Sequence, residues 1–249
     1  SAKPGEPFWH SPWGDGRPGW HIECSAMNMQ AFGEQIDIHG GGRDLIFPHH
    51  ENEIAQTEAL TGKRFAKYWI HNGLIKVNGQ KMSKSLGNSL LLADLLAEYS
   101  PETIKFALLQ TNYRGDINVT DNLFPEAEKH LYGFYKVMAD AKRAGAALDG
   151  TDAALDAEFD AAMDDDFNTP LAIAAMFELA TEINRTGDPV LVRQLKGLGA
   201  VLNILQLDPE NFLKGGASDA DEARINALIK ERREAKKAKN FARADEIRK

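Results

Sequence analysis

Residues 35–71 restrict the possible folds of this chain more than any other segment. Residues 35–39 alternate between apolar and polar side chains, as a strand does, and run directly into the glycines at positions 40–42. Pro48 suits the first turn of a helix, residues 54–60 continue with good helical propensity, and Gly62 follows. Residues 68–71 then have the character of a second strand. A helix between two strands predicts a parallel sheet, with ligand-binding groups gathered at the C-terminal ends of the strands.

Three side chains in or shortly before this region are candidate metal ligands: Cys24, His49 and Glu53. On a helix that starts at Pro48, His49 and Glu53 are four residues apart and share one face. Thiolate, imidazole and carboxylate groups together form a ligand set that suits zinc. The alternatives are an ordinary His–Glu contact on a helix surface and a buried free thiol. A metallopeptidase helix is excluded, because His49 and His50 are adjacent rather than four residues apart.

Cysteine usage also limits the compartment. Cys24 is the only cysteine in 249 residues, which argues against a disulfide framework and for a reducing environment.

A second candidate site follows about thirty residues downstream, in the run Lys81-Met82-Ser83-Lys84-Ser85. A lysine on a flexible stem can move onto a polyphosphate and neutralise charge that develops in a transition state. The alternative is a solvated surface turn. Of the two lysines in this run, Lys84 is the better candidate for such a role.

Together these segments resemble the cysteinyl-tRNA synthetases, which are class I aminoacyl-tRNA synthetases. The resemblance covers nearly the whole chain and is carried by residues 16–25, 37–45, 47–53, 81–85 and 163–170. It implies an enzyme that joins cysteine to ATP, which gives cysteinyl adenylate and pyrophosphate. The cysteine is then transferred to the terminal ribose of its tRNA.

The resemblance also implies roles for individual residues and one zinc ion per complete enzyme. Zinc would bind the substrate thiolate and so select against serine, whose alcohol is harder to ionise. ATP would be a substrate together with Mg²⁺, and Lys84 and Lys81 would be the catalytic residues. The matching positions are the zinc ligands Cys24, His49 and Glu53, the cysteine-pocket residues Trp20 and His21, and the nucleotide-binding residues Gly41, Gly42, Asp44 and Lys84.

The chain departs from the family pattern in two respects. The His-Ile-Gly-His segment that holds ATP in the family does not occur, and Cys24 matches only the second of the family's zinc-ligand cysteines. We therefore expect the N-terminal part of the catalytic domain to be a missing partner of this chain, and the isolated chain to be inactive.

The predicted fold class is α/β followed by all-α. Helical spacing dominates the second half, in residues 126–147, 155–163, 171–184 and 190–205, which predicts a helical bundle. The expected parts are a partial Rossmann-like catalytic domain with the zinc and ATP site (1–73), the lysine loop with a stem-contact region (74–121), a helical anticodon-binding bundle (122–215) and the start of a C-terminal tRNA-binding region (216–249).

Composition constrains the partners. No apolar run is long enough to span a bilayer, so we expect no membrane partner. The resemblance implies a cytoplasmic monomer that binds cysteine tRNA, cysteine and ATP. The net charge of -8 is unfavourable for tRNA binding, although residues 230–239 are locally basic. That stretch fits either a nucleic-acid surface or a solvated helix with i, i+4 ion pairs.

Two other functions remain open. A ligase that joins cysteine to an amino sugar in thiol-cofactor synthesis shares the zinc and lysine motifs, but it would not need a long helical bundle. A non-catalytic tRNA-binding paralogue would fit the missing nucleotide segment, but it has little reason to keep both chemical motifs.

Overall fold

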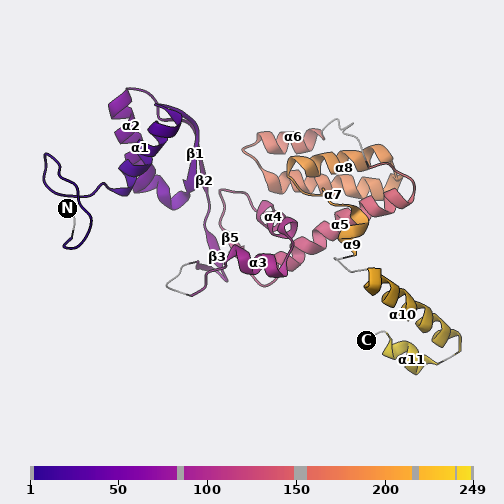
Figure 1. Ribbon diagram of the computed structural model, residues 1–249. Coiled ribbons are helices and arrows are strands. Elements are labelled where there is room, and N and C mark those ends of the chain that lie inside the picture. The colour runs from indigo at the N-terminus through magenta and orange to yellow at the C-terminus, as the bar shows by residue number, and fades with distance from the viewer. Residues whose placement is uncertain (1–2, 83–86, 149–155, 215–218, 239, 248–249) are drawn as a thin grey trace. The chain divides into compact units, whose positions relative to one another are not determined.

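The computed structural model of the chain describes residues 3–82, 87–148, 156–214, 219–238 and 240–247 (Figure 1). The chain forms two compact units. The first contains Ser1–Pro125 and Ala162–Pro170, and the second contains Glu126–Ala161 and Leu171–Lys249.

The first unit begins with a parallel pair of strands covered by helices. Its elements are α1 (Trp20–Phe32), β1 (Ile36–Gly42), the 3₁₀ turn η1 (Arg43–Leu45), the π-helical turn η2 (Ile46–His50), α2 (Glu51–Thr61) and β2 (Ala66–Asn72). β1 and β2 pair in parallel, from Ile36 opposite Ala66 to Gly42 opposite Asn72. The predicted strand–helix–strand unit is therefore confirmed, and β1 extends through the three glycines.

Burial at one end of the strands explains why this unit is stable. Ile36, Phe65 and Ala66 are buried together, and Ile54 of α2 and Trp69 of β2 pack against them. Full burial of an isoleucine or phenylalanine side chain is worth about 1.5–3 kcal/mol. The core fixes α2 against the sheet, which places the residues just before α2 near the C-terminal ends of both strands.

A second sheet, of three short strands, follows that the sequence pattern did not predict. It consists of β3 (Ile75–Val77), β4 (Gln80–Lys81) and β5 (Ile117–Val119), in the order β4-β3-β5. β3 and β4 form an antiparallel hairpin around Asn78 and Gly79, both of which have positive φ (49° and 80°). This is the backbone that a two-residue hairpin turn requires. The hairpin leads to Lys81, and β5 pairs with β3 in parallel.

Two short helices lie between β4 and β5: α3 (Leu92–Glu98) and α4 (Pro101–Leu109). Ser100 caps α4, because its side chain accepts a hydrogen bond from the backbone N–H of Thr103 at 3.0 Å. After α4 the backbone passes very close to the end of β2. A Cβ atom on Gly73 would lie only 1.9 Å from the carbonyl oxygen of Gly115, so this crossing requires glycine at position 73.

The second unit is helical, as expected. Its elements, labelled in Figure 1, are α5 (Leu123–Arg143, which begins in the first unit), α6 (Ala157–Asp164), α7 (Thr169–Thr186), α8 (Pro189–Val201), α9 (Pro209–Leu213), α10 (Asp219–Lys237) and α11 (Phe241–Glu246). No strand occurs after Val119 in the ranges that the structure describes.

The core of this unit is built on α5. Leu131, Phe134, Tyr135 and Met138 are buried at the spacing of one helix face. Phe134 stacks on Phe177 of α7 with ring centroids 4.5 Å apart. The buried hydroxyl of Tyr135 accepts a hydrogen bond from the Leu207 N–H at 3.2 Å, so its one polar atom is satisfied. Nowhere in the described ranges is a helix both long and apolar enough to cross a membrane.

Candidate active site

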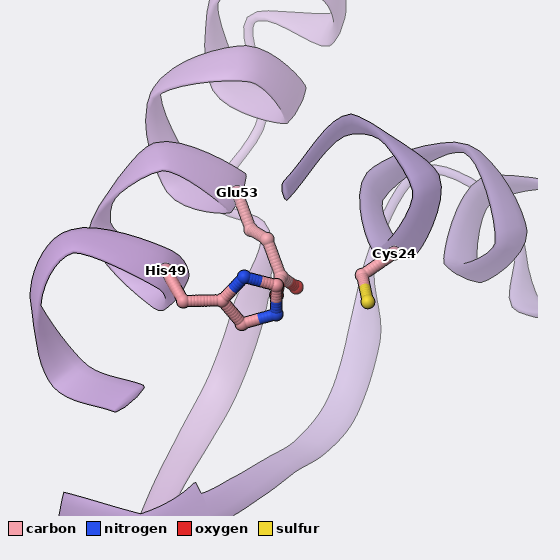
Figure 2. Close-up of side chains that lie close together, drawn as sticks. All are labelled: Cys24, His49 and Glu53. Carbon is pink, nitrogen blue, oxygen red and sulfur yellow. The ribbon is translucent and has the colours of Figure 1, made fainter. Parts of the chain in front are cut away.

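Cys24, His49 and Glu53 come from α1, η2 and α2, and their side chains point toward one another (Figure 2). One ligand atom from each residue lies within 4.8 Å of the other two. His49 and Glu53 are buried, and Cys24 is partly exposed. The structure thus brings the three predicted metal ligands together. Cys24 is 25 residues before His49 in the sequence, and Glu53 is four residues after it.

The two carboxylate oxygens of Glu53 have different surroundings. Oε2 lies 2.7 Å from Nε2 of His39, in hydrogen-bonding geometry. Oε1 lies 2.7 Å from Nε2 of His49, but this fully buried oxygen accepts no hydrogen bond. An unsatisfied buried acceptor is unfavourable by about 1–3 kcal/mol. A cation between the thiol, the imidazole and Oε1 would remove that penalty, and the donor set therefore fits a zinc ion.

His49 is held from the side opposite its ligand atom. Its Nδ1 lies 2.8 Å from Nδ1 of His21, and its ring packs on Trp20 with centroids 4.2 Å apart. When Nδ1–H of His49 donates to His21, the Nε2 atom keeps its lone pair and can bind a metal. Trp20 and His21, which the sequence analysis assigned to the cysteine pocket, both contact His49.

Further histidines surround the cluster: His39, His50 and His71, none of which was among the predicted ligands or pocket residues. Nδ1 of His50 lies 2.8 Å from Nε2 of His71, and the rings of His39 and His50 lie 4.8 Å apart. His39, His50 and Glu53 form a second group whose ligand atoms are close enough to share a cation. Burial, followed by the charges of neighbouring histidines, lowers the pKa of His50 to about 4, so this ring is neutral at physiological pH.

The signal for these residues lay in the strand register. His39 is opposite Trp69, and Gly41 is opposite His71. Alternate residues of a strand share a face, so the two strands present His39, Trp69 and His71 to one side of the sheet.

The Cys24 thiol lies close to negative charge. Burial, and then the carboxylates of Glu53 and Glu23, raise the pKa of Cys24 above its ordinary value. Without a cation the group is therefore a thiol at neutral pH. A metal ion would favour the thiolate, because it offsets the same negative charges.

The predicted nucleotide-binding segment lies at the end of β1, next to this cluster. A Cβ atom on Gly41 would lie 2.9 Å from Cε1 of His50, and one on Gly42 would lie 2.6 Å from Oδ1 of Asp44. The buried ring of His50 cannot easily move, so close approach requires glycine at position 41, whereas the exposed Asp44 side chain could move away from a Cβ at position 42. Nζ of Lys81 lies 3.4 Å from Oδ2 of Asp44, which joins the lysine hairpin to this segment. Lys84 lies outside the described residues.

Comparisons with known proteins agree with these motifs. Residues 1–129 match the family model for the catalytic domain of class I (C) tRNA synthetases, and residues 158–207 match the DALR domain. The cysteine–tRNA ligase of Legionella pneumophila (strain Corby) is 51% identical over 251 residues, and the alignment covers 99% of this chain and 54% of that protein. The cysteine–tRNA ligase of Azotobacter vinelandii is 51% identical over 254 residues, with coverage of 99% and 54%. The chain thus spans about half the length of the curated relatives it matches.

A solved structure supports the fold. A crystal structure of the Agrobacterium radiobacter K84 agnB2 LeuRS–tRNA–LeuAMS ternary complex aligns with a TM-score of 0.53 at 20% identity, over 74% of this chain and 27% of that one. The predicted α/β and helical parts are confirmed by the two matched domains together with the parallel strands and the helical second unit. The chain therefore belongs to the class I (C) tRNA synthetases, the family that its sequence motifs predict.

Proposed function

We propose that this chain serves the ligation of cysteine to its tRNA, through a cysteinyl adenylate formed from cysteine and ATP. The observation that carries the proposal is the convergence of Cys24, His49 and Glu53, with a buried and unsatisfied Glu53 oxygen, in a chain that is half identical to cysteine–tRNA ligases.

In this proposal Cys24, His49 and Glu53 hold a zinc ion. The bound ion would supply a soft Lewis acid that favours the thiolate of substrate cysteine over the alcohol of serine. The residues around it orient the ligands: His39 bonds to the outer oxygen of Glu53, and His21 bonds to the outer nitrogen of His49. Such bonds fix the rotamer and the protonation state of each ligand.

Trp20 and His21 form the proposed cysteine pocket. Both side chains contact the His49 ring, so a cysteine bound next to His49 would meet the Trp20 indole and the His21 imidazole. Trp20 is more than half exposed in this chain, which leaves its free face for a ligand. An indole covers the apolar methylene of cysteine and excludes water from the thiolate.

Gly41, Gly42 and Asp44 are the proposed ATP-binding residues, and Lys84 and Lys81 are the proposed catalytic residues, acting on an ATP with Mg²⁺. Lys81 and Asp44 are more than half exposed and 3.4 Å apart, so their ion pair is weak and phosphate can replace it. Lysine charge placed on the leaving pyrophosphate stabilises the transition state more than bound ATP.

The helical part would serve tRNA recognition. We propose residues 122–215 as the anticodon-binding bundle, residues 74–121 as the stem-contact region and residues 216–249 as the start of a further tRNA-binding region, in a cytoplasmic monomer. The ATP-holding His-Ile-Gly-His segment and a further zinc-ligand cysteine would come from a partner segment N-terminal to this sequence.

The experiment is cysteine-dependent ATP–pyrophosphate exchange on the complete protein, with zinc content measured on the same samples. We expect exchange with cysteine and none with serine, one zinc ion per protein, and charging of cysteine tRNA. Cysteine activation followed by transfer to an amino sugar instead of tRNA would identify the thiol-cofactor ligase. Binding of tRNA without any exchange would identify a non-catalytic paralogue and refute the proposal.

A further inference from the structure

Asp116, directly before β5, joins three segments of the first unit through one carboxylate. Its Oδ1 accepts a hydrogen bond from the Leu74 N–H at 2.9 Å and lies 2.8 Å from the Arg43 guanidinium. Its Oδ2 lies 2.8 Å from Nζ of Lys76 and accepts from the same guanidinium at 2.9 Å. The Asp116 side chain is only 17% exposed.

The partners of Asp116 lie at both edges of the proposed nucleotide site. Arg43 lies between Gly42 and Asp44 in the sequence, so its contact with Asp116 holds that segment in place. Lys76 on β3 is the cross-strand partner of Lys81 on β4. The carboxylate thus connects the end of β1 to the hairpin that leads into the lysine loop.

We propose that Asp116 is a positioning residue that holds the Gly41–Asp44 segment and the lysine hairpin in register for ATP. The proposal rests on the proposed function, since it assigns ATP to this segment. Asp116 itself does not touch the nucleotide. It acts through Arg43 and Lys76, and the direct Lys81–Asp44 contact lies beside this connection.

An ordinary exposed ion pair would hold the two segments together much more weakly. Exposed pairs contribute little, because solvent screens them and long side chains must be ordered. Asp116 differs in three respects: it is largely buried, it meets two cations, and it accepts a backbone N–H bond. The hydrogen bond from Lys76, followed by that from Leu74, lowers the pKa of Asp116 to about 2, so the connection persists at any physiological pH.

The test is Asp116→Asn in the complete protein, which keeps the size and the acceptor for Leu74 but removes the charge. Displacement of reacting groups by about 1 Å can slow catalysis by about 100-fold. Asp116→Asn removes the Asp116 ion pairs but leaves the Lys81–Asp44 contact, so we expect kcat/KM for ATP in cysteine-dependent exchange to fall by about tenfold. KM for cysteine should stay within about twofold and zinc content should not change, because the zinc ligands do not contact Asp116.

The matched control is Asp37→Asn. Asp37 lies on the same strand as Gly41 and pairs with Lys67 at 2.7 Å, but it is 81% exposed. This variant should behave like wild type. Asp116→Glu, which restores the charge, should recover part of the lost activity. Because the proposed connection is a single unit, Arg43→Gln combined with Asp116→Asn should be no worse than Asp116→Asn alone.

Three outcomes would count against one idea or the other. A wild-type protein without cysteine-dependent exchange refutes the proposed function and not the geometry of Asp116. An active wild type with Asp116→Asn equal to Asp37→Asn refutes the positioning role. Equal losses in ATP and cysteine parameters, together with a lowered melting temperature, would show that Asp116 serves only folding and also overturn the inference.

Discussion

Glu53 is a proposed metal ligand through one carboxylate oxygen and bonds to His39 through the other. It is therefore the most informative single position for the metal proposal. Glu53→Gln keeps the shape but removes the negative charge next to Cys24 and His49. Loss of even an outer partner of a metal ligand lowers affinity by about 10–100-fold, so loss of the ligand charge should lower zinc affinity by at least about 100-fold. Zinc content and a competition titration with a chromogenic chelator would measure this.

Glu51→Gln is the control for that substitution. Glu51 is exposed and stands two residues earlier on the same helix, α2. Removing its charge should leave zinc affinity within about twofold, since exposed charges are screened. Stoichiometric zinc with unchanged affinity in Glu53→Gln would remove Glu53 from the site.

Lys84 is predicted to act on the phosphates rather than on cysteine. Lys84→Ala should lower kcat for pyrophosphate exchange by about 100-fold or more and change KM for cysteine little, because its contact strengthens as charge develops on pyrophosphate. Lys63→Ala, which removes an exposed lysine paired with Glu34, is the matched control. An exchange rate equal to that of the control would exclude this role for Lys84.

At the scale of elements, the parallel strand–helix–strand unit was predicted correctly and the sheet of β3, β4 and β5 was not. The alternation of residues 35–39 and the helix before residues 68–71 predicted the parallel pair β1–β2, because both signals act within a few residues. β3 and β5 have three residues each and pair across about forty positions, so no local period marks them. Asn78-Gly79 was the available sign of the hairpin, since this dipeptide favours two-residue turns.

The start of the second helix also differs from the expectation. Pro48 was expected in the first turn of the helix, but α2 begins at Glu51 and a π-helical turn precedes it. Phe47 has extended dihedral angles (φ -133°, ψ 133°), which is the conformation that a following proline favours. His49 therefore lies in the π-helical turn that runs directly into α2, and its Nε2 lies 2.7 Å from Oε1 of Glu53.

The crossing of Gly73 and Gly115 gives a prediction about stability. Gly73→Ala would place Cβ 1.9 Å from a backbone oxygen, so backbone must shift, and we expect a loss of about 1–3 kcal/mol in the free energy of unfolding. Gly133→Ala is the opposite case: Gly133 lies inside α5 and an added Cβ would meet nothing within 4 Å. This variant should gain about 0.5–1 kcal/mol. Urea unfolding would measure the free energy of unfolding of both variants. An unchanged free energy of unfolding in Gly73→Ala would contradict the close approach of Gly73 and Gly115.

At the scale of the whole molecule, contacts between distant residues could be predicted from the sequence only for residues that belong to a family motif. Cys24, His49 and Glu53 were predicted together, and the structure gathers them. His39 and His71 were not, because their approach depends on the register between β1 and β2. The Asp116 connection depends on where the chain returns after α4, which composition and periodicity do not encode.

The division into two units allows metal binding to be read separately from the helical part. All four tryptophans, Trp9, Trp13, Trp20 and Trp69, lie in the first unit, whereas most helical residues lie in the second. Tryptophan fluorescence therefore reports the unfolding of the first unit, and circular dichroism at 222 nm reports mainly the second.

A ligand present at about 100 times its Kd stabilises its own unit by about 2.7 kcal/mol. Removing zinc with a chelator should thus lower the fluorescence midpoint by roughly 10 °C and leave the main dichroism transition in place. Equal shifts in both signals would show that the units unfold together, and no shift in either would show that the cluster of Cys24, His49 and Glu53 holds no metal in this chain.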